Sequence, residues 1–138
     1  MIGSLHVLIM DDDLTIRLAL AHALKTRGVQ VHTCSSLEAA LEAVQHHPFD
    51  VILADLRMRG QESLDGLELL KVARSVHPET RVIVMTAYGT DELEAEVRDH
   101  GGTYWAKSRD LDQLLVSVMS VPPKAPPISS GCPSSDSP

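Results

Sequence analysis

Residues 51 to 55, which read Val-Ile-Leu-Ala-Asp, restrict the folds open to this chain more than any other stretch. Four apolar residues run directly into one carboxylate, Asp55, and Pro48 precedes the run. A short apolar run rich in branched side chains is typical of a strand that is buried on both faces, as in the middle of a parallel sheet covered by helices. Open sheets of that kind place their ligand crevices at the carboxyl ends of the strands. We therefore expect Asp55 to stand at the functional edge of a sheet.

A second apolar run has the same form. Residues 7–10 read Val-Leu-Ile-Met and are followed at once by Asp11, Asp12 and Asp13. One of these acids, Asp12 or Asp13, can cap the next helix, because an aspartate side chain accepts hydrogen bonds from the free amides of a first helical turn. The remaining acids would lie at the end of a buried strand, as Asp55 does.

The rest of the sequence alternates between strand-like and helix-like segments. The expected strands are residues 5–10, 29–33, 51–55, 81–85 and 103–106. The expected helices, in which apolar residues recur at helical spacing, are residues 14–27, 37–46, 65–76, 91–100 and 111–118. Strict alternation implies right-handed crossovers and a parallel sheet. For five strands the order 2-1-3-4-5 puts a crevice at a switch point, so the predicted fold is a doubly wound, flavodoxin-like α/β sheet of five βα units.

The apolar stripes of the expected helices differ in strength. The third and the last helix offer Leu69, Val72, Ala73 and Val76, and Leu111, Leu114, Leu115 and Val118, respectively. The fourth helix offers only Leu93 and Val97 among many acids. We therefore expect the fourth helix to be held weakly against the sheet.

In this strand order the first and third strands are neighbours, so their acids converge at one edge. The side chains expected there are three carboxylates, one hydroxyl and one ammonium group: Asp11, Asp12, Asp55, Thr86 and Lys107. Carboxylates that lie together raise one another's pKa unless a cation lies between them. An all-oxygen ligand set with room for water suits Mg²⁺. The sequence therefore predicts a Mg²⁺ site.

Lys107 and Thr86 add the groups that an incoming anion needs. The lysine supplies a compact positive charge, and the hydroxyl can donate a hydrogen bond to an anion oxygen. Phosphoryl transfer depends mainly on positioning and charge neutralisation, so a carboxylate beside Mg²⁺ and a lysine can accept the group as an acyl phosphate. Asp55 is the expected phosphoacceptor.

Composition sets further limits. A chain of 138 residues, 43% hydrophobic and 22% charged, suffices for one domain with a core, which we place at residues 1–120. Residues 121–138 are rich in Pro and Ser and lack periodicity, so we expect a disordered tail or linker. The net charge of -7 argues against direct nucleic-acid binding by this domain.

The two cysteines, Cys34 and Cys132, lack metal-type spacing, and no segment has the form of a secretion signal or a membrane span. We therefore expect a cytoplasmic protein that does not bind a membrane.

In the same order along the chain, these residues resemble the motifs of the receiver domains of two-component response regulators, over residues 4–120. The pair Asp11-Asp12 resembles the family's acid pair, and Asp55 lies at its phosphoacceptor position. Thr86-Ala87 and Lys107 match its phosphoryl-binding residues, and Tyr104 matches its aromatic switch residue.

The resemblance implies that the domain takes a phosphoryl group from a histidine kinase or a phosphotransfer protein onto Asp55 in a Mg²⁺-dependent reaction. The domain would be a signalling protein that catalyses its own phosphorylation and dephosphorylation, not an enzyme acting on a separate substrate. The Arg57 backbone carbonyl would also bind the metal, and the Ala87 backbone would bind the phosphoryl group. Thr86 and Tyr104 would form a conformational switch.

The resemblance also implies an output surface. The fourth helix, fifth strand and fifth helix would form the face for a partner or for a homodimer. Residues 85–89, which read Met-Thr-Ala-Tyr-Gly, are similar to receivers that precede transcriptional activation modules. Transcription regulation is therefore one expected output.

Arg57 and Tyr88 lie two positions beyond Asp55 and Thr86, respectively. Large side chains there can exclude or misplace the water that would attack the acyl phosphate. We therefore expect these two residues to gate dephosphorylation and to slow it.

Two alternatives remain open at this point. Residues 11–15, Asp-Asp-Asp-Leu-Thr, also fit the DxDxT pattern of haloacid-dehalogenase-type phosphatases, which would use Asp11 as the nucleophile. The chain could instead be a pseudo-receiver, a binding module that keeps the fold without being phosphorylated. Two departures from the family pattern support the pseudo-receiver: Ser108 stands where the family has a proline, and the loop after Asp55 is longer than usual.

Overall fold

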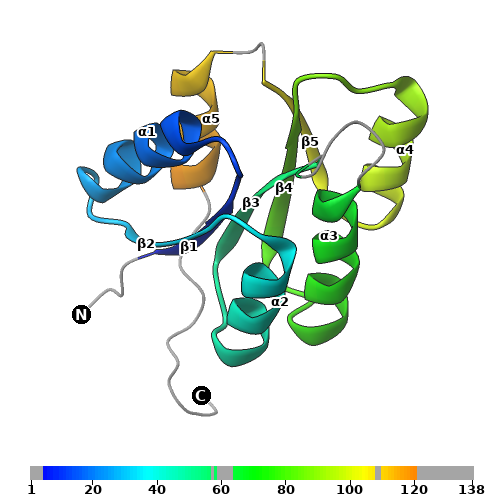
Figure 1. Ribbon diagram of the computed structural model, residues 1–138, viewed down its shortest axis with the longest axis horizontal. Helices are drawn as coiled ribbons and strands as arrows, with labels where there is room; N and C mark the ends of the chain where they lie inside the picture. The colour runs from blue at the N-terminus through cyan, green and yellow to red at the C-terminus, as the bar shows by residue number, and fades with distance from the viewer. Residues whose placement is uncertain (1–4, 57, 59–63, 108–109, 121–138) are drawn as a thin grey trace.

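The computed structural model describes residues 5–56, 58, 64–107 and 110–120. Its strands are β1 (His6–Met10), β2 (Gln30–Cys34), β3 (Val51–Asp55), β4 (Arg81–Thr86) and β5 (Thr103–Ala106). Its helices are α1 (Leu14–Lys25), α2 (Leu37–His46), α3 (Asp65–Val76), α4 (Asp91–Asp99) and α5 (Leu111–Met119). The strands form one parallel sheet in the order β2-β1-β3-β4-β5 (Figure 1). The predicted fold class and strand order are confirmed.

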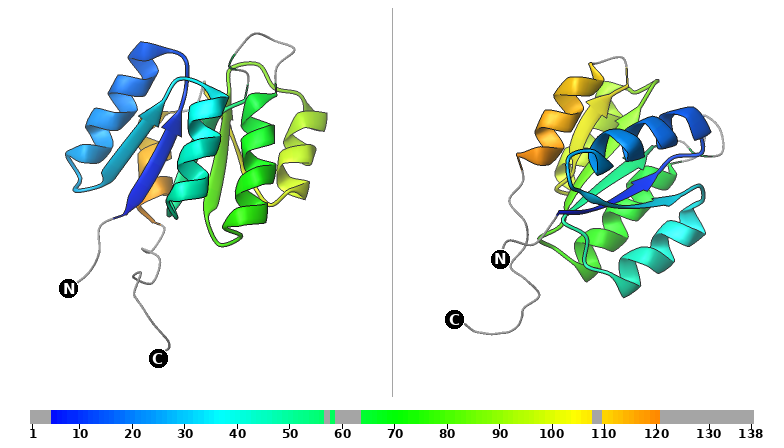
Figure 2. Two further views of the ribbon diagram at one scale, coloured as in Figure 1. Left: turned by 60° about the horizontal axis from the view of Figure 1, so that its bottom comes forward. Right: turned by 90° about the vertical axis from the view of Figure 1, so that its left-hand side faces the viewer.

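Helices cover both faces of the sheet. Helices α1 and α5 lie on one face, and α2, α3 and α4 lie on the other, as the views of Figures 1 and 2 agree. Because all strands run in one direction, their carboxyl ends meet at the same edge. Within the described part of the chain, every helix is too short or too polar to cross a membrane.

Strand β3 is the centre of the sheet, and its five residues are all buried. Val51 and Leu53 pack into the core beneath α1 and α5, while Ile52 and Ala54 pack into the core beneath α2, α3 and α4. Each large apolar side chain that is fully buried contributes about 1.5–3 kcal/mol to the free energy of unfolding. Burial on both faces explains why this strand lacks polar alternation, and it fixes Asp55 at the carboxyl edge.

Polar side chains mark the starts of most helices. Asp13, Ser36, Thr90 and Asp110 accept hydrogen bonds from backbone N–H groups in the first turns of α1, α2, α4 and α5, respectively. A cap of this kind stabilises a helix by about 1 kcal/mol. Of the two sequence alternatives for the cap of α1, the structure selects Asp13, which leaves Asp11 and Asp12 for the sheet edge.

Two members of the predicted core stripes are exposed instead of buried. Val76 is 39% exposed and Leu111 is 41% exposed. Val76 is the last residue of α3 and Leu111 is the first residue of α5, and a side chain at a helix end has fewer neighbouring elements to cover it. The other stripe residues are buried or half-buried: Leu69, Val72, Ala73, Leu114, Leu115 and Val118.

The start of α3 packs directly against the end of β3. The Gly66 N–H donates a hydrogen bond to the Leu56 carbonyl oxygen at 3.1 Å. A Cβ atom on residue 66 would lie 2.7 Å from the Asp55 carbonyl oxygen and 2.8 Å from the Leu56 Cα. Both of these neighbours are backbone atoms that cannot move aside cheaply. The bare glycine therefore lets α3 support the residue that ends β3.

Replacing Gly66 by alanine should destabilise the domain, although helix propensity favours alanine over glycine by about 1 kcal/mol. The clash with the backbone of Asp55 and Leu56 should outweigh this gain in helix propensity and lower the free energy of unfolding by about 1–3 kcal/mol. Urea denaturation of both proteins measures the change. As a reference, Ala95→Gly on the exposed face of α4 reports the propensity difference in this chain. A Gly66→Ala protein as stable as the wild type would contradict the close approach.

Candidate functional site

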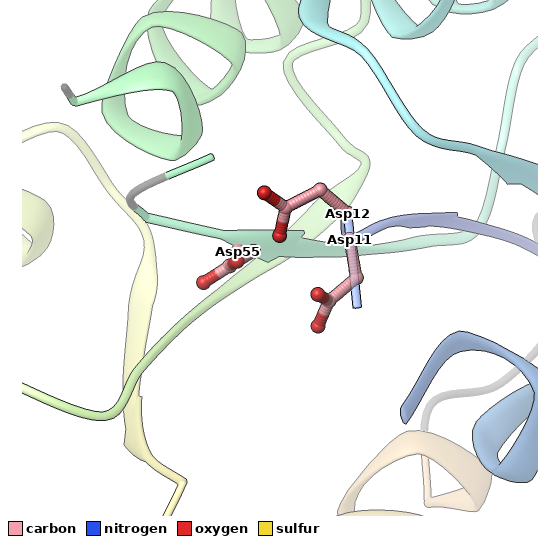
Figure 3. Close-up of side chains that lie close together, drawn as sticks. All are labelled: Asp11, Asp12 and Asp55. Atoms are coloured by element: carbon pink, nitrogen blue, oxygen red, sulfur yellow. The ribbon is translucent and has the colours of Figure 1, made fainter. Parts of the chain in front are cut away.

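Three carboxylates converge at the carboxyl edge of the sheet. Asp11 and Asp12 follow β1, and Asp55 ends β3 (Figure 3). Strands β1 and β3 are hydrogen-bonded neighbours in which Met10 pairs with Ala54, so the next residue of each strand reaches the same place. Each of the three acids offers a carboxylate oxygen, and these atoms lie within 4.8 Å of one another. The predicted convergence of the acids is confirmed.

Asp11 is the most fixed of the three acids. Its carboxylate is fully buried, and its oxygens accept hydrogen bonds from the Asp13 N–H at 2.9 Å and from the Lys107 Nζ at 3.1 Å. Its backbone N–H donates to the Cys34 carbonyl oxygen at 3.2 Å, and its own carbonyl oxygen accepts from Arg17 at 2.7 Å. Asp12 is exposed by contrast, so the cluster is buried on the side of Asp11 and open to solvent on the side of Asp12.

Lys107 lies directly after β5 and bridges two of the acids. Its Nζ lies 3.1 Å from Asp11 Oδ2 and 3.3 Å from Asp55 Oδ1. Its backbone N–H donates to the Thr86 carbonyl oxygen at 2.8 Å, which continues the ladder between β4 and β5. Burial alone would lower the pKa of Lys107, but the charges of Asp11 and Asp55 outweigh burial and raise it. The ammonium group is therefore held in its charged form between the acids.

The charge on Asp55 is only partly balanced. The pKa of its carboxyl group is raised to about 6: burial is the main cause, the charges of Asp11 and Asp12 act in the same direction, and Lys107 opposes them. One ammonium group is too little positive charge for three acids, so a further cation would favour the ionised form of Asp55. The all-oxygen donor set fits a hard divalent cation.

Thr86 lies beside the acids at the end of β4. Asp55 pairs with Met85 in the β3–β4 ladder, so Thr86 is one residue beyond that pair. Thr86 is buried, and its hydroxyl oxygen accepts the Tyr88 N–H at 3.1 Å. The hydroxyl can accept this bond and still donate its own hydrogen to another oxygen.

The remaining predicted site residues lie around this centre, where the structure describes them. Ala87 is exposed, Tyr88 is 72% exposed, and Tyr104 is half-buried on β5. Arg57 and Ser108 lie outside the described residues, so their predicted roles stay predictions. Sequence reasoning assigned no role to Gly66, although a glycine in the first turn of a helix is unfavourable and signals a packing requirement.

These parts define a class of site. Three carboxylates, an ammonium group and a hydroxyl lie at the switch point of a doubly wound parallel sheet, where such folds bind their ligands. Oxygen ligands for a divalent cation next to a fixed positive charge are the groups that binding and transfer of a phosphoryl group require.

Comparison with known proteins assigns the family. The family model described as response regulator receiver domain matches residues 7–118. The chain therefore belongs to the receiver domains of response regulators, as the sequence resemblance implied. This membership places it with receivers rather than with the haloacid-dehalogenase-type phosphatases.

Several known proteins are similar to this chain. Sporulation initiation phosphotransferase F of Bacillus subtilis is 33% identical over 113 residues, which cover 81% of this chain and 89% of that protein. The DNA-binding transcriptional regulator NtrC of Klebsiella pneumoniae is 36% identical over 111 residues, which cover 80% of this chain but 23% of the regulator. The solved structure of chemotaxis protein CheY4 of Vibrio cholerae matches with a TM-score of 0.75 and 30% identity, covering 86% of this chain and 99% of that chain. The chain thus spans most of two of these relatives and less than a quarter of NtrC.

Replacing Asp55 by asparagine should stabilise the metal-free domain at neutral pH. The pKa of this carboxyl group rises from 3.8 to about 6 on folding, so its charged form opposes folding, and the wild type loses stability as the pH rises through that interval. One pKa unit corresponds to about 1.4 kcal/mol, and the polarisability of the protein around the buried group reduces the effect, so we expect a gain of about 1–2 kcal/mol near pH 7.

Chemical denaturation in the presence of a metal chelator, from about pH 4 to pH 8, measures this difference. The gain should shrink at the acidic end of the range, where Asp55 is protonated in the folded wild type and is becoming protonated in the unfolded chain, whose pKa is 3.8. Asp13→Asn is the matched control, because asparagine caps a helix as well as aspartate does. A constant difference at every pH would mean that the charge of Asp55 is not its cause.

Proposed function

We propose that this receiver domain accepts a phosphoryl group on Asp55 and thereby acts as a phosphorylation-controlled switch. The observation that carries the proposal is the position of the Asp55 carboxylate, which lies 3.3 Å from the Lys107 ammonium group and in one cluster with Asp11 and Asp12. The similarity to a protein named sporulation initiation phosphotransferase F supports the same chemistry.

We further propose that Mg²⁺ is the resident cation. Asp11, Asp12 and Asp55 would hold it, together with the Arg57 backbone carbonyl, whose part rests on the family resemblance. The oxygen donors and the unbalanced negative charge fit this ion. Bound Mg²⁺ would neutralise charge on the acids and on the phosphoryl oxygens.

The residues of the chain carry out the transfer by position and charge. An Asp55 oxygen forms a bond to the phosphorus atom while the bond from phosphorus to the donor's imidazole nitrogen breaks, and the electron pair stays on that nitrogen. Lys107 balances negative charge on the transferred group, the Thr86 hydroxyl donates to one of its oxygens, and the Ala87 backbone N–H donates to another. The ionised form of Asp55 is the reactive one, because a protonated carboxyl group is a poor nucleophile.

Loss of the phosphoryl group occurs by attack of water on the same phosphorus atom. Tyr88 follows Thr86 by two positions, and its exposed ring lies at the solvent side of the β4–α4 loop. We propose that Tyr88, with Arg57 on the other loop, gates this water and lengthens the lifetime of the acyl phosphate.

The donor in this proposal is a sensor histidine kinase or a phosphotransfer protein, and the reaction takes place in the cytoplasm. The chain is a signalling domain that catalyses its own phosphorylation and dephosphorylation, not an enzyme with a separate substrate. In this proposal residues 1–120 form the domain, and the prediction of a tail or linker at residues 121–138 lies outside the described residues. Similarity to NtrC supports control of transcription as one output.

The output face consists of α4, β5 and α5. Helix α4 is anchored by Val97, which is fully buried, and by Leu93, which is partly buried, while most of its acids are exposed. A helix with so few apolar contacts is displaced at low cost. We propose that phosphorylation alters this face and so changes the binding of a partner or of a second copy of the chain.

The pseudo-receiver remains the second candidate. Its sequence support comes from Ser108 and from the loop after Asp55, which lie largely outside the described residues. The complete set of Asp11, Asp12, Asp55, Thr86 and Lys107 at one edge favours the phosphorylated receiver instead.

Mg²⁺ should bind to the acid cluster with an affinity that depends on Asp12. Isothermal titration calorimetry should give a dissociation constant that is at least about tenfold weaker in Asp12→Ala, because one charged oxygen ligand is lost. Asp13→Asn, which changes the neighbouring acid but keeps the helix cap, should leave the affinity close to that of the wild type. Unchanged affinity in Asp12→Ala would place the metal elsewhere.

Intact mass spectrometry tests the phosphoacceptor directly. Wild-type protein incubated with acetyl phosphate and Mg²⁺ should gain the mass of one phosphoryl group, and the gain should disappear on chelation of the metal. Asp55→Asn should show no gain, because the amide cannot form an acyl phosphate, whereas Asp13→Asn should behave as the wild type. A wild-type protein that stays unmodified under these conditions would favour the pseudo-receiver.

A further inference from the structure

Gly89 in the loop between β4 and α4 faces the side chain of Tyr104 at very short range. A Cβ atom built on residue 89 would lie 1.4 Å from the Tyr104 hydroxyl oxygen and 2.7 Å from its Cζ. The same Cβ atom would lie 3.1 Å from the Thr86 Cγ2. The Tyr104 hydroxyl therefore occupies the space that any other residue at position 89 would fill with its own side chain.

The backbone conformation of Gly89 does not require glycine. Among the described glycines, the positive φ angles are those of Gly28, 83°, and Gly101, 84°, and Gly89 is not one of them. Alanine at position 89 is therefore compatible with the backbone but requires the Tyr104 ring to move, and it is crowded by Thr86. The effect of adding a side chain at position 89 therefore depends on where the Tyr104 ring lies.

The same short loop is bonded to Thr86. The Tyr88 N–H donates to the Thr86 hydroxyl oxygen at 3.1 Å, so the loop residue next to Gly89 is tied to that hydroxyl. Tyr104 comes from the adjacent strand, where it pairs with Val84, and its ring packs on the core beneath α2, α3 and α4. The β4–α4 loop is therefore bonded to the Thr86 hydroxyl at Tyr88 and lies against the Tyr104 side chain at Gly89.

We propose that Gly89 is the positioning residue for Tyr104: its missing side chain leaves the space in which the ring lies against the β4–α4 loop, so the switch that the family resemblance implies between Thr86 and Tyr104 depends on glycine at position 89. The role of the contact in signalling rests on the proposed phosphorylation at Asp55. The position of the ring in the unmodified protein does not depend on that phosphorylation. These two parts are tested separately.

The first test is a double-mutant analysis in the metal-free protein. Gly89→Ala should lower the urea midpoint in the wild-type background, because the ring is forced out of its place. The decrease should be smaller in Tyr104→Phe, which removes the atom at 1.4 Å but keeps the one at 2.7 Å, and it should vanish in Tyr104→Ala. A decrease of equal size in all three backgrounds would overturn the proposal, since Tyr104 would then not be its cause.

The second test follows the ring itself. The chain has two tyrosines, so protein labelled with an isotope at tyrosine Cζ gives two NMR signals, and Tyr88→Phe assigns them. In Gly89→Ala without metal, the Tyr104 signal should shift toward its position in urea-unfolded protein. An unshifted signal would mean that the ring does not rest on Gly89, and would overturn the proposal even if the stability changes.

The third test addresses signalling with Mg²⁺ and beryllofluoride, a mimic of the phosphoryl group. The Tyr104 signal of the wild type should shift on addition of the mimic, and the shift should be lost in Gly89→Ala although fluorine NMR shows that the mimic is bound. An equal shift in both proteins would overturn transmission through Gly89. If the wild type does not bind the mimic, the proposed function fails, and the first two tests alone decide whether Gly89 positions Tyr104.

Discussion

The two ion pairs of Lys107 hold the functional edge of this domain together. They join the residue after β5 to the ends of β1 and β3, although β4 lies between β3 and β5 in the sheet. The pairing is possible because a parallel sheet brings the carboxyl ends of all its strands to one edge, and because hydrogen bonds from and to the backbone fix Asp11 within reach of the lysine. One ammonium group against three carboxylates nevertheless leaves an excess of negative charge. The fold therefore brings the acids and the lysine together while leaving negative charge that one ammonium group does not balance.

Much of this arrangement follows from the sequence, because the features that determine it are patterns of side chains. The unbroken apolar runs before Asp11 and Asp55 predict buried strands, and the alternation with helices predicts a parallel sheet whose order brings these acids together. The positions of Thr86 and Lys107 at strand ends follow in the same way. Such predictions succeed because burial and strand direction act on whole segments, so a single residue seldom reverses them.

What the sequence does not reveal depends on single contacts between distant segments. Gly66, and in our proposal Gly89, act through the absence of a side chain. A glycine at the start of a helix can hint at a close contact, but the sequence does not show which segment it approaches. Val76 and Leu111 fit the apolar stripes of their helices, yet both are exposed because they stand at helix ends, where coverage depends on the path of the adjoining chain. The choice of Asp13 over Asp12 as the helix cap is likewise a matter of local geometry rather than of residue type.

The distribution of rigidity indicates where a change at Asp55 can travel. Strand β3 is buried along its whole length, and the backbone of α3 at Gly66 lies close to the end of this strand. Neither the strand nor this helix can therefore shift without losing core contacts. The β4–α4 loop is exposed, and the Tyr88 N–H donates a hydrogen bond to the Thr86 hydroxyl oxygen. The loop leads into α4, whose apolar contacts with the core come from Val97 and Leu93. A typical coupling free energy of about 1–3 kcal/mol is small beside the cost of disrupting the core and comparable to the cost of moving such a loop. This difference in packing is the physical reason for proposing that a change of charge at the site is passed on toward α4 and β5 rather than toward α3.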